Sequence, residues 1–212
     1  MRIENLRKEY TLDDLSRRRL AKTPLEQFTS WFEEAVAAEI AEPTAMTLAT
    51  SDEQGRPSAR IVLLKGFAEE GFDFYTNYSS RKGRELAANP QAALLFFWQP
   101  LQRQVRIGGR VSKLPRELSD QYFASRPRGS RLSAVASPQS EEVESRGVLE
   151  RIVETLDQDH QEREIRRPEG WGGYRLRATE IEFWQGRASR LHDRFRYRLE
   201  ADGGWSIARL AP

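Results

Sequence analysis

The 212-residue chain contains no cysteine and only two histidines, His160 and His192. The missing thiols exclude disulfide bonds, a thiolate nucleophile and a cysteine-based zinc site. His160 lies in a heavily charged segment and is expected to be solvated. Redox chemistry in this chain would therefore need a bound cofactor.

Excess charge and long apolar runs are lacking too. The 34 Lys and Arg residues against 32 Asp and Glu residues give a formal net charge of only +2. Proteins that bind nucleic acid through its phosphates usually carry a larger excess, so we expect no nucleic-acid partner. No apolar signal region follows Met1 and no apolar run has membrane length, so we expect a cytoplasmic protein without membrane association.

The familiar nucleotide and metal motifs are also absent. The sequence has no glycine-rich dinucleotide fingerprint, no phosphate loop ending in Gly-Lys-Ser/Thr and no His-Glu-x-x-His zinc helix. We therefore predict no metal site. A phosphate-bearing ligand would have to be held by cations brought together from separate segments.

The distribution of charge and apolar residues predicts a two-part organisation. Residues 1–22 are rich in charge, and we expect a mobile N-terminal arm that orders over a ligand. Thr23-Pro24-Leu25-Glu26 is typical of a helix start with a capping box. Leu25, Phe28, Phe32 and Val36 would form the apolar face of that helix, with Trp31 widening it. Residues 23–212 are predicted to be a single domain.

Most of that domain is predicted to be strand. Short runs rich in β-branched and aromatic residues, separated by turn residues, predict strands at 45–50, 58–66, 72–76, 92–98, 103–113, 174–184, 195–200 and 205–210. Residues 92–98 are expected to be buried on both faces, and Gly108-Gly109 is expected to form a bulge. Helices are predicted at 79–88, 115–124 and 141–164, the last capped by Ser140, with a loop at 125–131. This pattern favours a mainly β fold, a barrel with flanking helices.

The segment 60–83 combines a predicted hairpin with four cations. Residues 61–64 and 72–75 are expected to pair across a turn at Glu69-Glu70-Gly71. Arg60 and Lys65 bracket the first strand, and Arg81 and Lys82 open the helix that follows Ser80. Backbone N–H groups at a helix start beside two cations suit a phosphate. A hairpin with ordinary solvated charges is the alternative.

His192 lies in F-W-Q-G-R-A-S-R-L-H-D-R-F. If this segment is extended, Arg190, His192 and Arg194 lie on one face. Two guanidinium groups beside an imidazole disfavour its protonation, which indicates a neutral, hydrogen-bonding histidine. A solvated, charged strand is the alternative.

Five blocks of the sequence, taken together and in this order, resemble the pyridoxine/pyridoxamine 5'-phosphate oxidase family. They are R-I-V-L-L-K, Y-T-N-Y-S-S-R-K-G, Y-F-A-S-R-P-R-G-S, S-P-Q-S and F-W-Q-G-x-x-x-R-L-H-D-R. Each block alone is weakly specific, but the similarity extends from Arg7 to the final R-L-A-P. The resemblance implies an FMN-binding split β-barrel that works as a homodimer, with each flavin between the subunits.

The resemblance also implies roles for individual residues. The FMN site would comprise Arg60, Ile61, Val62, Leu63, Leu64, Lys65, Tyr75, Thr76, Arg81, Lys82, Gln104, Gln139, Ser140, Trp184 and Arg194. The substrate would be bound by Arg7, Lys8, Glu9, Tyr10, Lys65, Tyr122, Arg126, Ser130, Arg190, Leu191 and His192. Arg190 and His192 would be the catalytic residues.

The activity implied is oxidation of pyridoxamine 5'-phosphate and pyridoxine 5'-phosphate to pyridoxal 5'-phosphate. Hydride would pass from the substrate to the flavin, and O2 would reoxidise the flavin to give H2O2. Two alternatives remain at this point: a split-barrel flavin oxidase for another aromatic compound, such as a phenazine precursor, and a non-catalytic carrier of flavin or pyridoxal phosphate.

Overall fold

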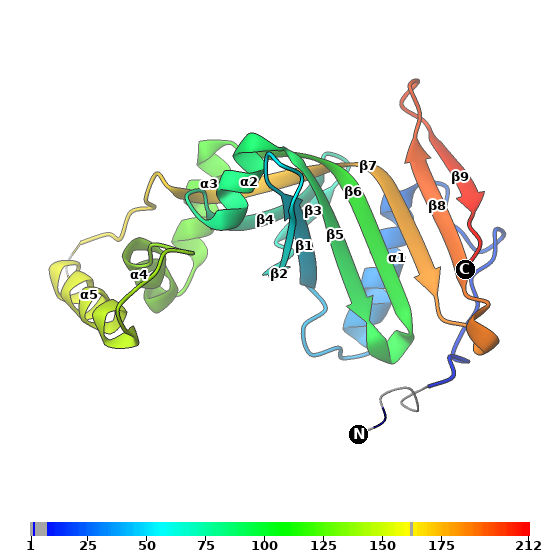
Figure 1. The fold of residues 1–212 in the computed structure, drawn as a ribbon, viewed down its shortest axis with the longest axis horizontal. Helices are drawn as coiled ribbons and strands as arrows, with labels where there is room; N and C mark the ends of the chain where they lie inside the picture. Colours follow the sequence, from blue (N-terminus) through cyan, green and yellow to red (C-terminus); the bar gives the residue numbers. More distant parts are fainter. Residues whose placement is uncertain (1, 3–7, 162) are drawn as a thin grey trace.

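The computed structural model describes residues 2, 8–161 and 163–212, and it shows a mainly β chain with flanking helices (Figure 1). Nine strands of the described residues form one antiparallel sheet. They are β1 Ala45–Ser51, β2 Pro57–Leu63, β3 Gly66–Ala68, β4 Gly71–Asn77, β5 Gln91–Trp98, β6 Arg103–Lys113, β7 Trp171–Gln185, β8 Asp193–Leu199 and β9 Trp205–Arg209. Their order is β2-β1-β5-β6-β7-β4-β3, and β8 joins β7 to β9.

The sheet divides along β7. The first half of this strand pairs with β4 and the second half pairs with β8, while β6 runs beside both halves. The register of β6 and β7 shifts between Gly108 and Gly109, which confirms the predicted bulge. A Cβ at Gly109 would lie 2.0 Å from the carbonyl oxygen of Arg177, so the close approach requires glycine.

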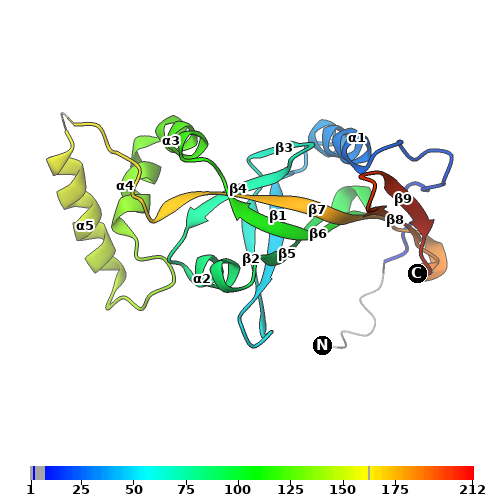
Figure 2. The ribbon, with the colours of Figure 1, turned by 90° about the horizontal axis from the view of Figure 1, so that it is seen from above.

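The helices occupy different sides and ends of this sheet. α1 Pro24–Ala37 covers the core, and α2 Arg81–Ala88 follows β4. α3 Arg116–Ser125, α4 Arg128–Ala136 and α5 Arg146–Asp159 gather at one end of the molecule, and β8 and β9 lie at the other end in both views (Figures 1 and 2). Two short 3₁₀ helices, η2 Gln99–Leu101 and η3 Ala188–Arg190, follow β5 and β7.

Aromatic side chains fill the core beneath α1. The ring of Phe28 is fully buried, and its centroid lies 4.9 Å from Phe67, 5.0 Å from Phe72 and 5.3 Å from Phe96. These contacts are edge-to-face, a geometry worth about 1 kcal/mol per pair beyond the burial itself. One helix residue thus joins α1 to β3, β4 and β5.

The apolar face of α1 differs in part from the prediction. Phe28 is buried and Phe32 packs against the core, but Val36 is 51% exposed, so its assignment to the buried face is wrong. Trp31 and Ala35 are buried instead. The buried stripe is therefore rotated toward Trp31, whose ring lies 4.4 Å from the guanidinium carbon of Arg103.

The predicted start of α1 is confirmed, and its contribution to stability is testable. The Thr23 hydroxyl accepts the N–H of Glu26, and the Glu26 carboxylate accepts the N–H of Thr23. We expect Thr23→Ala to lower the free energy of unfolding by about 1 kcal/mol because it removes one half of this box. Urea denaturation would measure this loss. Ser30→Ala, on the exposed side of the same helix, should change stability by less than about 0.5 kcal/mol, and an equal loss in both variants would contradict the assignment.

The predicted hairpin between residues 61–64 and 72–75 is wrong. β2 pairs along its length with β1, whereas β4 pairs with the short strand β3. The predicted strand is interrupted at Leu64 and Lys65, between β2 and β3. The Lys65 N–H donates to the Asp73 carbonyl at 2.8 Å. The predicted turn before Gly71 is present, but it joins β3 to β4. β2 is consequently an edge strand of the sheet.

Three further predictions need correction. Residues 92–98 form β5 as expected, but Phe97 is 49% exposed, so this strand is buried on one face rather than two. The loop predicted at 125–131 contains the start of α4 at Arg128. The long helix predicted from residue 141 begins at Arg146, with Ser145 rather than Ser140 at its N-cap position.

Candidate active site

A cavity of about 500 Å³ lies between the β2 edge, β4, the start of α2 and the α3–α4 segment. Its walls include most of the cations and aromatic residues that the sequence singled out. The lining residues are Arg60, Ile61, Val62, Leu63, Lys65, Tyr75, Thr76, Lys82, Tyr122, Arg126, Pro127, Ser130, Gln139 and Trp171. Segments more than 70 residues apart in the chain therefore meet at one cavity.

Lys82 is the buried cation of this cavity. Its side chain is 8% exposed, and Nζ donates to Gln139 Oε1 at 3.0 Å, Thr76 Oγ1 at 3.2 Å and Ser80 Oγ at 3.4 Å. All three partners are neutral, and within the described residues no carboxylate lies at ion-pair distance from Nζ. Burial, followed by the charge of Arg60, lowers the pKa of Lys82. A buried ammonium held only by neutral oxygens favours an anionic ligand.

The start of α2 places Lys82 there. Ser80 is the N-cap residue, and its hydroxyl accepts the N–H of Gly83 while donating to the carbonyl of Asn77. Lys82 is then in the first turn of α2, which is the positive end of the helix dipole. A Cβ at Gly83 would lie 2.1 Å from the carbonyl oxygen of Tyr78, so glycine allows the helix to start this close to β4.

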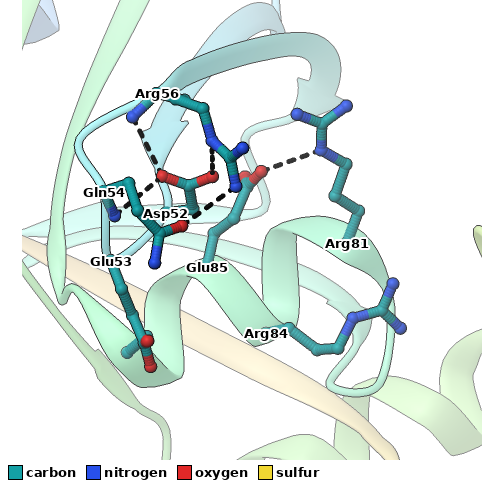
Figure 3. A pocket seen from close by; sticks show the side chains of 8 residues that line it. Asp52, Glu53, Gln54, Arg56, Arg81, Arg84 and Glu85 are labelled. Atoms are coloured by element: carbon teal, nitrogen blue, oxygen red, sulfur yellow. Dashed lines mark hydrogen bonds and ion pairs between the residues drawn. The ribbon is translucent and has the colours of Figure 1, made fainter.

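Arg60 and Arg81 are joined by Glu85. Arg60 donates to Glu85 Oε2 at 3.3 Å, and Arg81 Nε donates to Glu85 Oε1 at 2.9 Å. Arg81 and Glu85 line a second hollow, of about 630 Å³, between α2 and the β1–β2 turn (Figure 3). The structure thus places Arg60 in the wall of the cavity and Arg81 beside it, 61% exposed.

Part of the cavity wall is aromatic and carries one poorly satisfied guanidinium. Tyr75 and Tyr122 are stacked with ring centroids 3.9 Å apart, and Trp171 continues the stack. The guanidinium carbon of Arg126 lies 4.7 Å from the Trp171 ring, and its Nη1 is buried without a hydrogen-bond partner in the described part of the chain. Burial lowers the pKa of Arg126. Ser130 lies in the first turn of α4 and also lines the cavity.

A second group of predicted residues lies elsewhere. A hollow of about 470 Å³ is lined by Lys8, Glu9, Tyr10, Arg187, Ser189, Arg190 and His192. The Tyr10 ring meets Trp184 edge-on at 5.8 Å, and Trp184 lies 4.6 Å from the His192 ring. Gln104 and Arg194 pair with Trp184 on the adjacent strands. The structure therefore brings the arm residues Lys8 to Tyr10 to the predicted catalytic residues.

Not every predicted residue is well placed in a single chain. Leu191 is 71% exposed, Arg194 is bound to Glu182 at 2.8 Å, and Leu64 is buried in the core. Ser140 is exposed and has a φ of 75° next to Gln139. Arg7 lies outside the described residues.

The predicted common face of Arg190, His192 and Arg194 is wrong. The segment is not extended: η3 covers Ala188–Arg190, and Ser189 and Arg190 have φ values of 53° and 62°. β8 begins only at Asp193. Two successive non-glycine residues in the left-handed region are strained, and the Glu9 carboxylate supports them by accepting the Ser189 N–H at 3.0 Å.

His192 has a defined hydrogen-bonding role. Its Nδ1 lies 3.0 Å from the backbone N of Arg187 and accepts that N–H. A neutral ring that accepts at Nδ1 carries its proton on Nε2. Burial, followed by the charge of Arg190, lowers the pKa of His192 below 6.5, which agrees with the neutral histidine predicted from its neighbours.

This pKa makes a prediction about titration. The NMR midpoint of His192 should lie below 6.5, and Arg190→Gln should raise it toward 6.5 because a nearby cation is lost. Because the folded pKa is the lower one, the unfolded chain binds more protons. His192 therefore contributes stability above pH 6.5, and that stability is lost as the pH falls toward the folded pKa. A midpoint at or above 6.5 would contradict the structure.

The two groups lie on separate parts of the chain. The 500 Å³ cavity is built by β2, β4, α2, α3 and α4, whereas the second group sits at the β7–β8 connection. Neither hollow shares a lining residue with the other. Each chain therefore carries its predicted site residues in two separate groups.

Glu85 and Trp171 are the residues that reasoning from sequence missed. Glu85 lies four residues after Arg81, a spacing that signals a helical ion pair. Trp171 had no such signal, because its place in the aromatic stack depends on the pairing of β7 with β4.

Comparison with known proteins extends this description. A family model described as pyridoxamine 5'-phosphate oxidase matches residues 32–159, and one described as the pyridoxine 5'-phosphate oxidase C-terminal dimerisation region matches residues 171–212. The chain belongs to the pyridoxine/pyridoxamine 5'-phosphate oxidase family. The sequence resemblance is confirmed.

Individual members of this family align with the whole chain. A pyridoxine/pyridoxamine 5'-phosphate oxidase of Salinibacter ruber is 55% identical over 213 aligned residues, covering 100% of this chain and 99% of the relative. One of Nostoc sp. is 56% identical, covering 99% of this chain and 98% of the relative.

Solved structures share the fold. PhzG from Burkholderia lata 383, crystallised with tetrahydrophenazine-1-carboxylic acid, matches with a TM-score of 0.89 and 30% identity, covering 95% of this chain and 100% of its own. An FMN binding protein from Nostoc punctiforme PCC 73102, related to pyridoxamine 5'-phosphate oxidase, matches in fold with a TM-score of 0.72 at 16% identity. The predicted split β-barrel is thereby confirmed. None of the helices in residues 2, 8–161 and 163–212 has the length and hydrophobicity needed to cross a bilayer.

Proposed function

We propose that this chain is an FMN-dependent oxidase that converts pyridoxamine 5'-phosphate and pyridoxine 5'-phosphate to pyridoxal 5'-phosphate, with O2 as electron acceptor and H2O2 as by-product. The observation that carries the proposal is a cavity lined by both the buried Lys82, at the start of α2, and the under-satisfied Arg126, at the end of α3. Two cations from different elements suit two phosphates, one on a flavin and one on a substrate.

The residues present fit FMN. Lys82 offers a buried ammonium without a carboxylate partner, and Thr76, Ser80 and Gln139 surround it with polar oxygens. Arg60, Lys65 and Arg81 add positive charge nearby. These residues would hold the flavin phosphate, and the exposed Ile61 and Leu63 of β2 would pack on its ring. When bound, FMN supplies the two-electron acceptor that the side chains of this protein lack.

The number of cations in and beside the cavity supports the binding of two phosphates. Each phosphate monoester brings nearly two negative charges at neutral pH. Five cations, Arg60, Lys65, Arg81, Lys82 and Arg126, lie in or beside the cavity, and Glu85 offsets one of them. The remaining positive charge is close to what the two ligands require.

The substrate would bind through Arg126, Ser130, Tyr122 and Lys65. Arg126 donates in a fixed plane because it stacks on Trp171, and this preorganisation favours bidentate binding of a phosphate. A phosphate site also separates this function from oxidation of an unphosphorylated phenazine precursor, the alternative raised by the likeness to PhzG.

Arg190 and His192 would act on the substrate ring. His192 holds its proton on Nε2 while Nδ1 accepts the Arg187 N–H, so it can donate a hydrogen bond but cannot serve as a general base in that state. Arg190 would donate hydrogen bonds that orient the substrate ring, and Tyr10 of the arm would exclude water.

A homodimer would complete the site. Arg190 and His192 lie at the β7–β8 connection, apart from the cavity of their own chain, and the family model over residues 171–212 describes a dimerisation region. A second copy would bring these residues, together with Gln104, Trp184 and Arg194, over the flavin.

Anaerobic titration tests the function. The purified yellow protein, mixed without air with pyridoxamine 5'-phosphate, should lose its visible flavin absorbance and regain it on aeration with release of pyridoxal 5'-phosphate. A carrier would bind without bleaching, and a phenazine-type oxidase would bleach equally well with an unphosphorylated substrate. Either result would reject the proposal.

A further inference from the structure

Glu85 is a buried carboxylate that the proposed chemistry does not use. It lies on the inner side of α2 and is 5% exposed. Oε2 accepts hydrogen bonds from Ser58 Oγ at 2.6 Å, Thr50 Oγ1 at 2.5 Å and Arg60 Nη2 at 3.3 Å. Oε1 accepts from Arg81 Nε at 2.9 Å (Figure 3). The two oxygens therefore face two different sets of donors.

The carboxylate is held in its charged form. Burial by itself would raise the pKa of Glu85, but the hydrogen bonds from Ser58, Thr50 and Arg81 and the charge of Arg60 outweigh it and lower the pKa to about 2. The negative charge therefore persists at every pH at which the protein works. This carboxylate forms ion pairs with Arg60 on β2 and with Arg81 on α2.

Arg60 and Arg81 differ in how many of their N–H groups already donate to the protein. Both Nη atoms of Arg60 already donate to protein groups, including the Leu48 carbonyl at 3.2 Å and the hydroxyls of Thr50 and Ser58. Arg81 donates through Nε to Glu85. Its two Nη atoms have no hydrogen-bond partner among the described residues. Glu85 thus fixes one edge of the Arg81 guanidinium and leaves the other edge free for an anion.

We propose that Glu85 is a positioning residue for phosphate binding, acting through Arg81 and Arg60 rather than by touching the ligand. This inference rests on the proposed FMN site. Without Glu85, Arg81 would be a freely rotating surface side chain, and an arginine ordered beforehand loses less conformational entropy when it binds. Arg60 would become a largely buried guanidinium without a counter-charge.

The variant Glu85→Gln distinguishes this positioning role from a direct electrostatic effect of the Glu85 charge on the phosphate. The carboxylate uses both oxygens as acceptors, but an amide offers one oxygen and one NH2 group. The variant must turn that NH2 group toward either Arg81 or the Ser58–Thr50–Arg60 set, where it faces other donors. A through-space role predicts the opposite sign, because removing a negative charge near a phosphate would tighten binding.

The test compares FMN with riboflavin, which lacks the phosphate. Both dissociation constants are measured for the apoprotein by quenching of flavin fluorescence. Glu85→Gln should weaken FMN binding by about tenfold or more, the equivalent of one charge-assisted hydrogen bond, and leave riboflavin binding within about twofold. Glu53→Gln, which removes the same charge from an exposed residue lining the same hollow, should change neither.

The outcomes distinguish this inference from the proposed function. If the wild-type protein binds FMN no more tightly than riboflavin, the phosphate site itself is wrong and both fail. If the wild type prefers FMN and Glu85→Gln keeps or increases that preference, this inference alone is overturned. Should Glu85→Gln not fold, Glu85→Asp carries the test, because it keeps the charge but is one methylene shorter. It should lose affinity for FMN but not for riboflavin, and an equal loss for both flavins would overturn the inference.

Discussion

Lys82→Met is expected to yield a folded protein that purifies without flavin. Methionine fills about the volume of the buried lysine stem but removes the ammonium that Gln139, Thr76 and Ser80 hold in place. Losing a buried, charge-assisted phosphate contact should raise the dissociation constant of FMN on the order of 100-fold. Folding should be preserved, because taking a buried cation out of the apoprotein costs little.

The ratio of flavin absorbance to protein absorbance after purification, followed by titration of the apoprotein with FMN, measures this effect. Lys113→Met is the matched control: Lys113 lies over the Tyr78 ring at 4.2 Å and lines a different hollow. This variant should remain yellow. A fully yellow Lys82→Met protein would show that the flavin phosphate does not bind at the start of α2.

Arg126→Ala is expected to raise KM for pyridoxamine 5'-phosphate on the order of 100-fold, with kcat changed by only a few-fold. The guanidinium is preorganised on Trp171 and has a buried Nη1 without a partner in the described chain, so the phosphate would satisfy a group that the protein leaves open. Loss of such a contact should weaken substrate and transition state alike, which raises KM alone.

Steady-state kinetics of the FMN-loaded variant measure this split. Arg128→Ala is the control, because Arg128 lies two residues away in an exposed ion pair with Asp157 and does not line the cavity. Its KM should stay within about twofold of wild type. An unchanged KM in Arg126→Ala, or a fall in kcat with constant KM, would place the substrate phosphate elsewhere.

The sequence predicted local features of this protein well where a few neighbouring residues determine them. The capping box at Thr23 and the helix start at Ser80 are both present, because each depends on hydrogen bonds within about three residues. Three of the four cations of segment 60–83, namely Arg60, Lys65 and Lys82, do line one cavity, whereas Arg81 lies beside it and lines a different hollow.

Long-range pairing was less predictable. Residues 61–64 and 72–75 have the pattern of a hairpin, yet β2 pairs with β1 and leaves Ile61 and Leu63 exposed. Nothing local distinguishes the two pairings, since a short apolar strand can pair with either partner. The same limit applies to Trp171 and to the contacts that Glu85 makes outside its own helix, because these partners come from other elements. The prediction that Ser140 is the N-cap residue of α5 was wrong for a different reason. Ser140 and Ser145 are both suitable N-cap residues, and the sequence alone does not decide between them.

The division of the sheet along β7 has a consequence for how the cofactor is kept. On the proposed function, one chain carries the phosphate-binding part of one site, lined by β2, β4, α2, α3 and α4, and the His192 part of another, at the β7–β8 connection. On the proposed dimer, flavin retention and subunit association become a single linked equilibrium. Bound FMN then holds the two subunits together, and a newly made chain becomes yellow only after it has met its partner.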